Sequence, residues 1–281
     1  MRNSCDIIVE IDVVKAMEDG YKFLKSKNDV ILLPGKGPEG QLPPCYFKNV
    51  WYKPKSNGKL DPNPKQDITF DMTPYPYLLV LDFEANCVEN AQLPCQEIIE
   101  FPVVPIDTKT LKIIDDKIFH QYVKPTVVPK ITEFCTGLTG IKQETVDVGI
   151  SIVETLKNLD KWMTSNGFTS ENSTFVTCGR WDLSTCLKKE AEYKKITLPD
   201  YLRKYINVKD AWMVTFFKNK AHGMPGMLQS LDLELDGKHH SGIDDSKNIA
   251  KIAIGLIKKR TLFSRTQDII VKPHDANTIE E

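Results

Sequence analysis

Residues 77–84 have the sequence YLLVLDFE, in which five hydrophobic residues lead directly into Asp82, Phe83 and Glu84. An uninterrupted apolar run of this length predicts a strand over Leu78–Phe83 that is buried on both faces of a sheet. Side chains two residues apart in a strand point to the same face, so Asp82 and Glu84 are expected side by side. The sequence therefore predicts two neighbouring carboxylates at the end of a central strand.

Two carboxylates in such a place need compensation. Unpaired, they would repel each other, and each would lose several kcal/mol of hydration on burial. A divalent cation is the usual remedy, because hard cations prefer oxygen ligands. The alternative is that the strand simply ends here and both acids face water, which is the commoner explanation for an isolated Asp-x-Glu. The metal site is thus a hypothesis that needs support from the rest of the chain.

The segments around this strand indicate an α/β protein. Three strands joined by short turns, followed by alternating helices and strands, are typical of a mixed sheet with helices packed on it. The further strands are expected at Glu97–Asp107, Leu111–Val123, Thr174–Cys178 and Tyr205–Val208, and the helices at Val148–Ser165, from Asp182 onward and at Asp244–Arg260.

The first part of the chain has a different composition. Residues 34–64 contain seven prolines and four glycines, which disfavour a helix or a central strand and indicate an extended linker or wrapping arm. A short helix is expected before it, around Val13–Ser26. We therefore divide the chain into an irregular N-terminal extension (1–74), a main domain (75–262) and a C-terminal tail (263–281).

The overall composition limits the classes of function. The 281 residues are 41% hydrophobic and 27% charged, with a formal net charge of −1, so a nucleic-acid partner would be held locally or through metal ions rather than by bulk positive charge. No apolar run approaches the ~20 residues of a membrane-spanning helix, so we expect no membrane association. Acidic residues near the N-terminus argue against a signal or transit peptide, which predicts a cytoplasmic or nuclear location. The seven cysteines form no CxxC pair, which argues against a disulfide framework or a structural zinc site.

Three more residues are candidates for chemistry. Asp182 stands just before an expected helix, where an N-cap role is an equally good explanation. Asp245 precedes Ile249 by four residues and so lies on the apolar stripe of the last helix, a local inconsistency that function explains better than stability. His240 precedes it in a glycine-containing turn, and an exposed loop histidine is the alternative there.

Together these residues resemble the DEDDh superfamily of 3′–5′ exonucleases, with Asp82-x-Glu84, Asp182 and His240 followed by Asp245. Within it the chain is most similar to the Enhanced-RNAi-type exoribonuclease family. The similarity covers roughly residues 75–262, and four stretches in family order carry it: LDFEANC at 81–87, EIIEFP at 97–102, LTGI at 138–141 and HSGIDDSKNIA at 240–250.

The resemblance implies an RNase H-like (DnaQ-like exonuclease) fold with a mixed five-stranded sheet flanked by helices. It implies removal of nucleoside 5′-monophosphates from the 3′ ends of single-stranded RNA with two Mg²⁺ or Mn²⁺ ions per active site. By position, Asp82, Glu84 and Asp245 would be metal ligands, and Asp182 would hold the second metal. Glu84 and His240 would be catalytic, His240 as general base, and Glu84, Ala85 and His240 would border the terminal nucleotide.

The chemistry of the residues is consistent with this assignment. Clustered carboxylates would repel an anionic phosphodiester unless metals reverse the local charge, and an imidazole with a pKa near 6.5 can accept a proton from water at neutral pH. His239 competes with His240 for that role. Hydrolysis of DNA, or of both polymers, is the nearest alternative function, followed by an RNA-binding relative without activity. A glycosidase pair formed by Asp82 and Glu84 comes last, since it leaves the other acids and the histidine unexplained. Arg180, beside Trp181, departs from the family pattern.

Overall fold

The structure is a computed structural model, and it describes residues 73–259 except Phe217 and Asn219, together with Thr261 and Phe263. It also describes the backbone of five short strands outside or at the edge of this range. They are β1 (Ile7–Ile8), β2 (Lys22–Lys25), β3 (Val30–Leu33), β4 (Val50–Trp51) and β12 (Gln267–Asp268).

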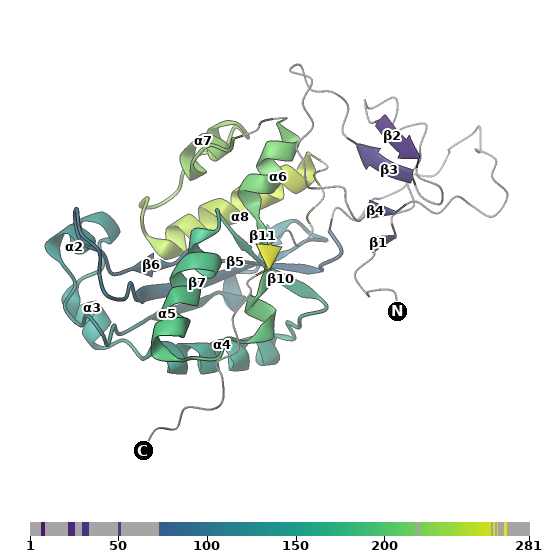
Figure 1. Cartoon of the computed structure of the whole chain (residues 1–281). Coiled ribbons are helices and arrows are strands. Elements are labelled where there is room, and N and C mark those ends of the chain that lie inside the picture. Colours follow the sequence, from purple (N-terminus) through teal and green to yellow (C-terminus); the bar gives the residue numbers. More distant parts are fainter. Residues whose placement is uncertain are drawn as a thin grey trace.

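The described domain is built on one mixed sheet (Figure 1). Its strand order is β12-β11-β10-β5-β7-β6, and β8 and β9 also pair with β7. The main-domain strands are β5 (Tyr77–Val80), β6 (Glu84–Ala85), β7 (Ile98–Asp107), β8 (Lys112–Ile113), β9 (Phe119–Tyr122), β10 (Ser173–Thr177) and β11 (Lys204–Asn207). The expected mixed sheet is confirmed, but it contains eight strands rather than five: five have four or more residues and three have two.

The direction of the strands decides where the loops meet. β10 runs parallel to both β5 and β11, whereas β5 and β7 are antiparallel. The carboxyl ends of parallel neighbours lie at the same edge of a sheet. The residues that follow β5 and those that follow β10 therefore come together, although about a hundred positions separate them in the sequence.

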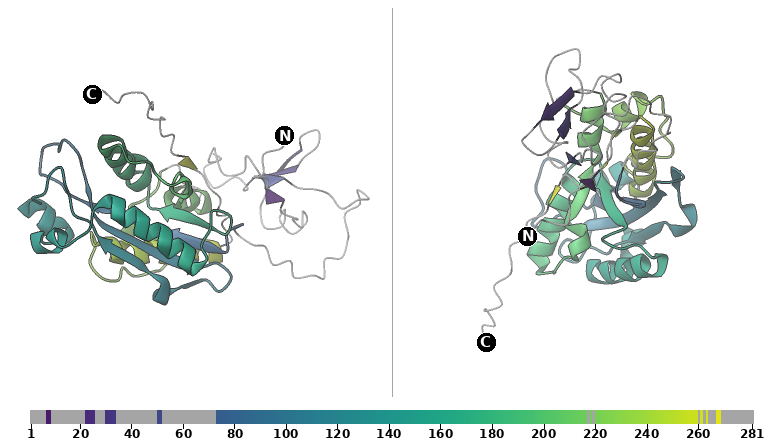
Figure 2. Two further views of the ribbon diagram at one scale, coloured as in Figure 1. Left: turned by 90° about the horizontal axis from the view of Figure 1, so that it is seen from below. Right: turned by 90° about the vertical axis from the view of Figure 1, so that its right-hand side faces the viewer.

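Helices cover both faces of the sheet, giving three layers (Figures 1 and 2). Helices α6, α7 and α8 lie on one face, and α4 and α5 on the other, while α2 and α3 pack at one end. Their bounds are α2 (Glu133–Thr139), α3 (Gln143–Asp147), α4 (Ile152–Asn166), α5 (Lys188–Lys194), α6 (Val208–Thr215), α7 (Met224–Gln229) and α8 (Gly242–Lys258). A π-helical segment η2 (Asp182–Leu187) leads into α5, and short 3₁₀ turns lie at Asp115–Lys117 and Asp200–Leu202.

Side chains of the apolar run at β5 point alternately to the two faces of the sheet, so the run contributes to two hydrophobic clusters. Leu79 and Leu81 pack in the cluster under α4 and α5, whereas Leu78 and Val80 pack in the cluster under α6, α7 and α8. All four side chains are fully buried. The strand is thus apolar on both faces, as its sequence predicted, because helices cover it from both sides.

Three expectations about secondary structure need correction. The strand expected over Leu111–Val123 is broken into β8, a 3₁₀ turn and β9, because Asp115 and Asp116 begin the turn. The helix expected from Val148 begins at Ile152, with Ser151 as its N-cap, and Val148 is 84% exposed. The helix expected around Val13–Ser26 lies largely outside the described residues, and the part that is described, Lys22–Lys25, is a strand paired with β3.

The division into 1–74, 75–262 and 263–281 stays a prediction, because most of the first and last segments lie outside the described residues. Within the described part of the chain, no helix has the length and hydropathy that crossing a membrane requires.

Candidate active site

The first acidic pair is formed by Asp82 and Asp182, which follow the parallel strands β5 and β10. The Leu81 amide still donates to the Val176 carbonyl at 3.0 Å, as in a regular ladder. Two residues further on, the Phe83 amide donates to Asp182 Oδ1 at 2.9 Å instead. The Asp182 side chain therefore takes the place of a strand carbonyl and binds the start of η2 to the chain around Asp82.

This contact settles what Asp182 does at its helix. Asp182 is 3% exposed, and its carboxylate accepts a hydrogen bond from Phe83, 99 positions away, rather than serving as the N-cap of η2. The helix around it is π-helical from Asp182 to Leu187. π-Helical turns are rare and occur mostly at functional sites, because the extra residue redirects a side chain.

Glu84 enters the site from β6, which pairs with β7 across a register shift. Glu84 is opposite Glu100 and Ala85 is opposite Ile98, so one extra residue of β7 lies between the two pairs. β-Bulges of this kind twist a strand locally and aim a side chain. Glu84 is 8% exposed, and Ala85 beside it is 5% exposed.

Asp245 comes from the first turn of α8, which packs against β7. Oxygens of Asp82, Glu84 and Asp245 all lie within 4.8 Å of one another. Asp245 Oδ2 accepts a hydrogen bond from the His240 amide at 2.9 Å, whereas Oδ1 is buried and has no hydrogen-bond partner among the described residues. An acceptor oxygen buried in this way is costly unless it has a ligand.

The electrostatics of the cluster are unfavourable in the absence of a cation. Burial, followed by the Glu100 carboxylate, raises the pKa of Glu84 to about 8. Burial and then Asp182 raise the pKa of Asp82 well above its ordinary value, and burial raises the pKa of Asp182 to about 6. The pKa of Asp245 is also raised, chiefly by burial. A set of carboxylates with these pKa values and one unpartnered oxygen suits a hard divalent cation.

The two histidines lie in the turn before α8. Their rings stack with centroids 4.0 Å apart, and His239 Nε2 lies 3.9 Å from Asp245 Oδ2. His240 has a positive φ of 67° and an exposed side chain. Partial burial and the neighbouring His239 lower the pKa of His240, which favours a neutral imidazole at pH 7. Both rings are within reach of the acidic cluster, so the geometry alone does not separate them.

Glu100 is a residue that the sequence analysis missed. It is 2% exposed and its two oxygens accept the Gly242 amide at 3.0 Å and the Ile243 amide at 3.2 Å. His120 Nε2 lies 2.8 Å from Glu100 Oε1. The carboxylate therefore binds the first amides of α8, the helix that carries Asp245. A signal was present, since an acid in the middle of an apolar strand is as inconsistent locally as Asp245 in its stripe.

Lys209 is a second residue that the analysis missed, and its charge acts on one of the acids. Its charge lowers the pKa of Asp182, against the larger effect of burial. It follows β11, the next parallel strand of the sheet, so only the strand order brings it to the site. Trp181 and Arg180, which the sequence placed beside Asp182, are both exposed.

A family profile described as Exonuclease matches residues 79–253. A second profile, described as RNA 2'-phosphotransferase, Tpt1 / KptA family, matches residues 1–35, most of which lie outside the described residues. The second match covers only a short piece of the chain and carries no assignment.

Individual relatives agree with the first profile. ERI1 exoribonuclease 3 of Homo sapiens is 41% identical over 201 residues, which cover 71% of this chain and 59% of that protein. The 3'-5' exonuclease Snipper of Drosophila melanogaster is 36% identical, covering 70% of this chain and 75% of that protein. The solved nuclease domain of 3'hExo, a DEDDh family member bound to rAMP, superposes with a TM-score of 0.66 at 33% identity, covering 69% of this chain and 98% of that one. The chain thus spans less than two thirds of the length of ERI1 exoribonuclease 3.

Proposed function

Because the chain belongs to the exonuclease family and has the RNase H-like fold of DEDDh nucleases, we propose that it is a metal-dependent 3′–5′ exoribonuclease. Its substrate is the 3′ end of single-stranded RNA, and its products are nucleoside 5′-monophosphates. The observation that carries the proposal is the convergence of Asp82, Glu84 and Asp245, with Asp245 Oδ1 buried and unpartnered in the described part of the chain.

In this proposal Asp82, Glu84 and Asp245 hold one divalent cation and Asp182 helps to hold a second. Mg²⁺ or Mn²⁺ fits this set, because both ions prefer carboxylate oxygens. Such ions neutralise the phosphodiester, lower the pKa of the attacking water and stabilise the leaving 3′ oxygen. Support comes from the pKa of Glu84, which burial and then the neighbouring carboxylates raise to about 8.

His240 is proposed as the general base that removes the proton of the attacking water. Its pKa is lowered, so the ring is neutral and able to accept a proton at pH 7. The hydrogen bond from its backbone amide to Asp245 keeps the backbone close to the acids, while the exposed side chain is free to turn. His239 is the competitor, and its contact with Asp245 makes a purely electrostatic role for that ring equally consistent with the geometry.

Glu84, Ala85 and His240 are proposed to border the terminal nucleotide. Ala85 follows Glu84 directly in the chain, so it lies next to one of the carboxylates. Preference for RNA over DNA would depend on contacts to the 2′-OH. The relatives point to RNA through the name exoribonuclease, although Snipper is named only as an exonuclease.

A degradation assay tests the proposal directly. The full chain is incubated with 5′-labelled single-stranded RNA and with DNA of the same sequence, in Mg²⁺, Mn²⁺ or EDTA. A ladder that shortens from the 3′ end of RNA, and only with metal, is the expected result. Equal loss of DNA would instead indicate a nuclease for both polymers. RNA binding without cleavage in any metal would contradict the assigned activity.

The assignment of the base has its own test. His240→Ala should lose nearly all turnover while it still binds Mn²⁺ and nucleoside monophosphate, because only the proton acceptor is removed. His239→Ala is the matched control and should retain most of the rate. If the two variants behave the other way round, the base is His239.

A further inference from the structure

A pocket outside the acidic cluster lies between the loop that follows β6 and helix α5. Its volume is about 350 Å³, and its walls are residues 86–88 and 91–96 on one side and Lys189 and Tyr193 on the other. Pockets of this size hold small ligands or single groups of larger ones. None of the residues described above as site candidates lines it.

Both walls continue elements that carry the acids. Asn86 is two residues beyond Glu84, so the loop wall begins directly after the strand that carries this acid. The helical wall belongs to the run that starts at Asp182 and continues through η2 into α5. At 1.5 Å per residue, Lys189 and Tyr193 lie roughly 10–17 Å along this run from Asp182. A strand whose 3′ end lies at the acids would therefore reach the pocket within a few nucleotides.

The chemistry of the pocket fits a nucleotide. Tyr193 is 53% exposed, so its ring is available for stacking on a base, and the exposed Lys189 sits one helical turn before it. Gln92 and Gln96 supply amides that can donate to or accept from base edges. No acidic residue lines the pocket, so an anionic backbone meets no direct repulsion. An aromatic side chain beside a cation is how proteins hold single strands without strict sequence preference.

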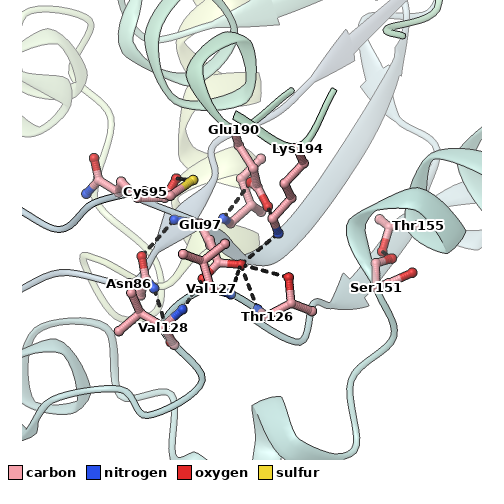
Figure 3. Close-up of polar contacts among 12 residues, drawn as sticks. Asn86, Cys95, Glu97, Thr126, Val127, Val128, Ser151, Thr155, Glu190 and Lys194 are labelled. Carbon is pink, nitrogen blue, oxygen red and sulfur yellow. Dashed lines mark hydrogen bonds and ion pairs between the residues drawn. The ribbon is translucent and has the colours of Figure 1, made fainter. Parts of the chain in front are cut away.

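Figure 3 shows a network of polar contacts next to Asn86 and Cys95 of the loop wall. In it, Lys194 Nζ lies 2.7 Å from Glu97 Oε1 and 2.7 Å from Glu190 Oε1. Glu190 Oε2 also accepts the Ile98 amide at 2.9 Å, and Asn86 Oδ1 accepts the Glu97 amide at 2.7 Å.

These bonds tie α5 to the start of β7 and to the loop wall. Glu97 also accepts the amides of Thr126, Val127 and Val128, so the carboxylate at the centre of the network is fully satisfied. Lys194 is committed to two carboxylates, which leaves Lys189 and Tyr193 as the free groups of α5 at this surface.

We propose that this pocket binds a base of single-stranded RNA upstream of the scissile bond, with Tyr193 stacking on the base and Lys189 contacting a neighbouring phosphate. The inference rests on the proposed nuclease function, since it assigns the route of that substrate away from the acids. The pocket lies outside the terminal nucleotide site, so it acts on affinity for longer strands and not on the chemical step.

Two substrates separate the pocket from the active site. The p-nitrophenyl ester of uridine 5′-monophosphate fills only the terminal site, whereas an oligouridylate of twelve residues can also reach the pocket. Tyr193→Ala should raise KM for the oligomer about tenfold, as expected for loss of one stacking contact. Its kcat on the oligomer and its rate on the ester should stay unchanged. Lys189→Gln should raise the oligomer KM by a smaller factor.

Matched controls make the result specific. Tyr193→Phe keeps the ring and should retain the oligomer KM. Lys157→Gln removes an exposed charge from α4, away from the pocket, and should retain the oligomer KM as well. An unchanged oligomer KM in Tyr193→Ala would overturn the inference. Equal losses on the ester and the oligomer would overturn it too, because the tyrosine would then serve the catalytic centre or the fold.

A binding measurement keeps the pocket testable apart from catalysis. Fluorescence anisotropy of labelled oligouridylate in EDTA should show weaker binding by Tyr193→Ala even if the wild-type chain cleaves nothing, a result that would defeat the nuclease proposal and leave the pocket standing. Wild-type and Tyr193→Ala chains that bind the oligomer equally would point to another occupant, such as a peptide, and would sink this inference.

Discussion

Among single residues, Glu84 has unfavourable surroundings. It is 8% exposed, faces Glu100 across the strand pair, and its pKa is raised to about 8. In the unfolded chain its pKa is that of an ordinary glutamate, near 4.3. Between these values the folded protein binds a proton that the unfolded chain has released, so stability falls as pH rises through this window. The acidic cluster is thus a place where function costs stability.

The thermal stability of the metal-free protein should therefore fall from about pH 4.5 to about pH 8. Glu84→Gln removes one of the opposing charges, so in EDTA this variant should melt several degrees higher than wild type at pH 8 and show a smaller fall. With Mn²⁺ the order should reverse, because the variant loses a ligand. Melting curves at several pH values measure this. Glu144→Gln, an exposed residue of α3, is the control, and wild-type and Glu84→Gln curves that run parallel would refute the argument.

At the scale of an element, the contacts at the start of α8 decide where Asp245 lies. Its first amides bind Glu100, and a Cβ at Gly242 would lie 2.7 Å from the Asp82 carbonyl oxygen and 3.1 Å from Glu100 Oε2. The helix can approach the end of β5 this closely only because residue 242 has no side chain. One glycine and one buried carboxylate thus set the distance between two of the candidate metal ligands.

Gly242→Ala should push the start of α8 away from Asp82. Overpacking of this kind costs about 1–3 kcal/mol of stability, and a misplacement near 1 Å can lower kcat about a hundredfold. Melting temperature and turnover on RNA measure both effects. Gly255→Ala is the control in the same helix, where the added Cβ meets methyl groups of Leu231 at 3.2 and 3.6 Å and of Leu233 at 3.6 Å and should leave activity intact. Normal turnover in Gly242→Ala would show that α8 is less tightly placed than the contacts imply.

At the scale of the whole molecule, charge is almost balanced, with 37 basic and 38 acidic residues. Such a balance supplies no excess of positive charge to attract a polyanion. On the proposed function, affinity for RNA comes from a few local contacts, such as Lys189 in the pocket beside α5, and from cations at the acidic cluster. Binding should accordingly respond weakly to salt.

In EDTA, the logarithm of the RNA association constant should fall with the logarithm of salt concentration with a slope between about −1 and −2, as for two or three phosphate contacts on a single strand. Lys189→Gln should reduce the size of the slope by about 0.7. Anisotropy titrations between 50 and 200 mM KCl, about the range in which such contacts weaken strongly, give both values. A slope steeper than about −4 would mean an extended basic surface that the balanced charge does not suggest.

Several features could be predicted from the sequence because they depend on local pattern. The apolar run before Asp82 predicted a strand buried on two faces, and the stripe containing Ile249 and Ile252 predicted the buried side of α8. The mixed sheet followed from the order of these patterns. The predicted start of helix α4 was less accurate. Val148 fits the helical spacing, yet Ser151 caps the helix and leaves Val148 in solvent.

The candidate site was named from the sequence, but its construction was decided by the tertiary structure. Residue types and spacing alone singled out Asp82, Glu84 and Asp245 as candidates. Only the packing of β5 beside β10 shows that Asp182 bonds to Phe83, and only the approach of α8 to β7 shows the role of Glu100. The pocket between α5 and the loop after β6 is likewise invisible in the sequence. Patterns along a chain record which face of an element is buried, whereas contacts between distant segments depend on which elements become neighbours in the folded sheet.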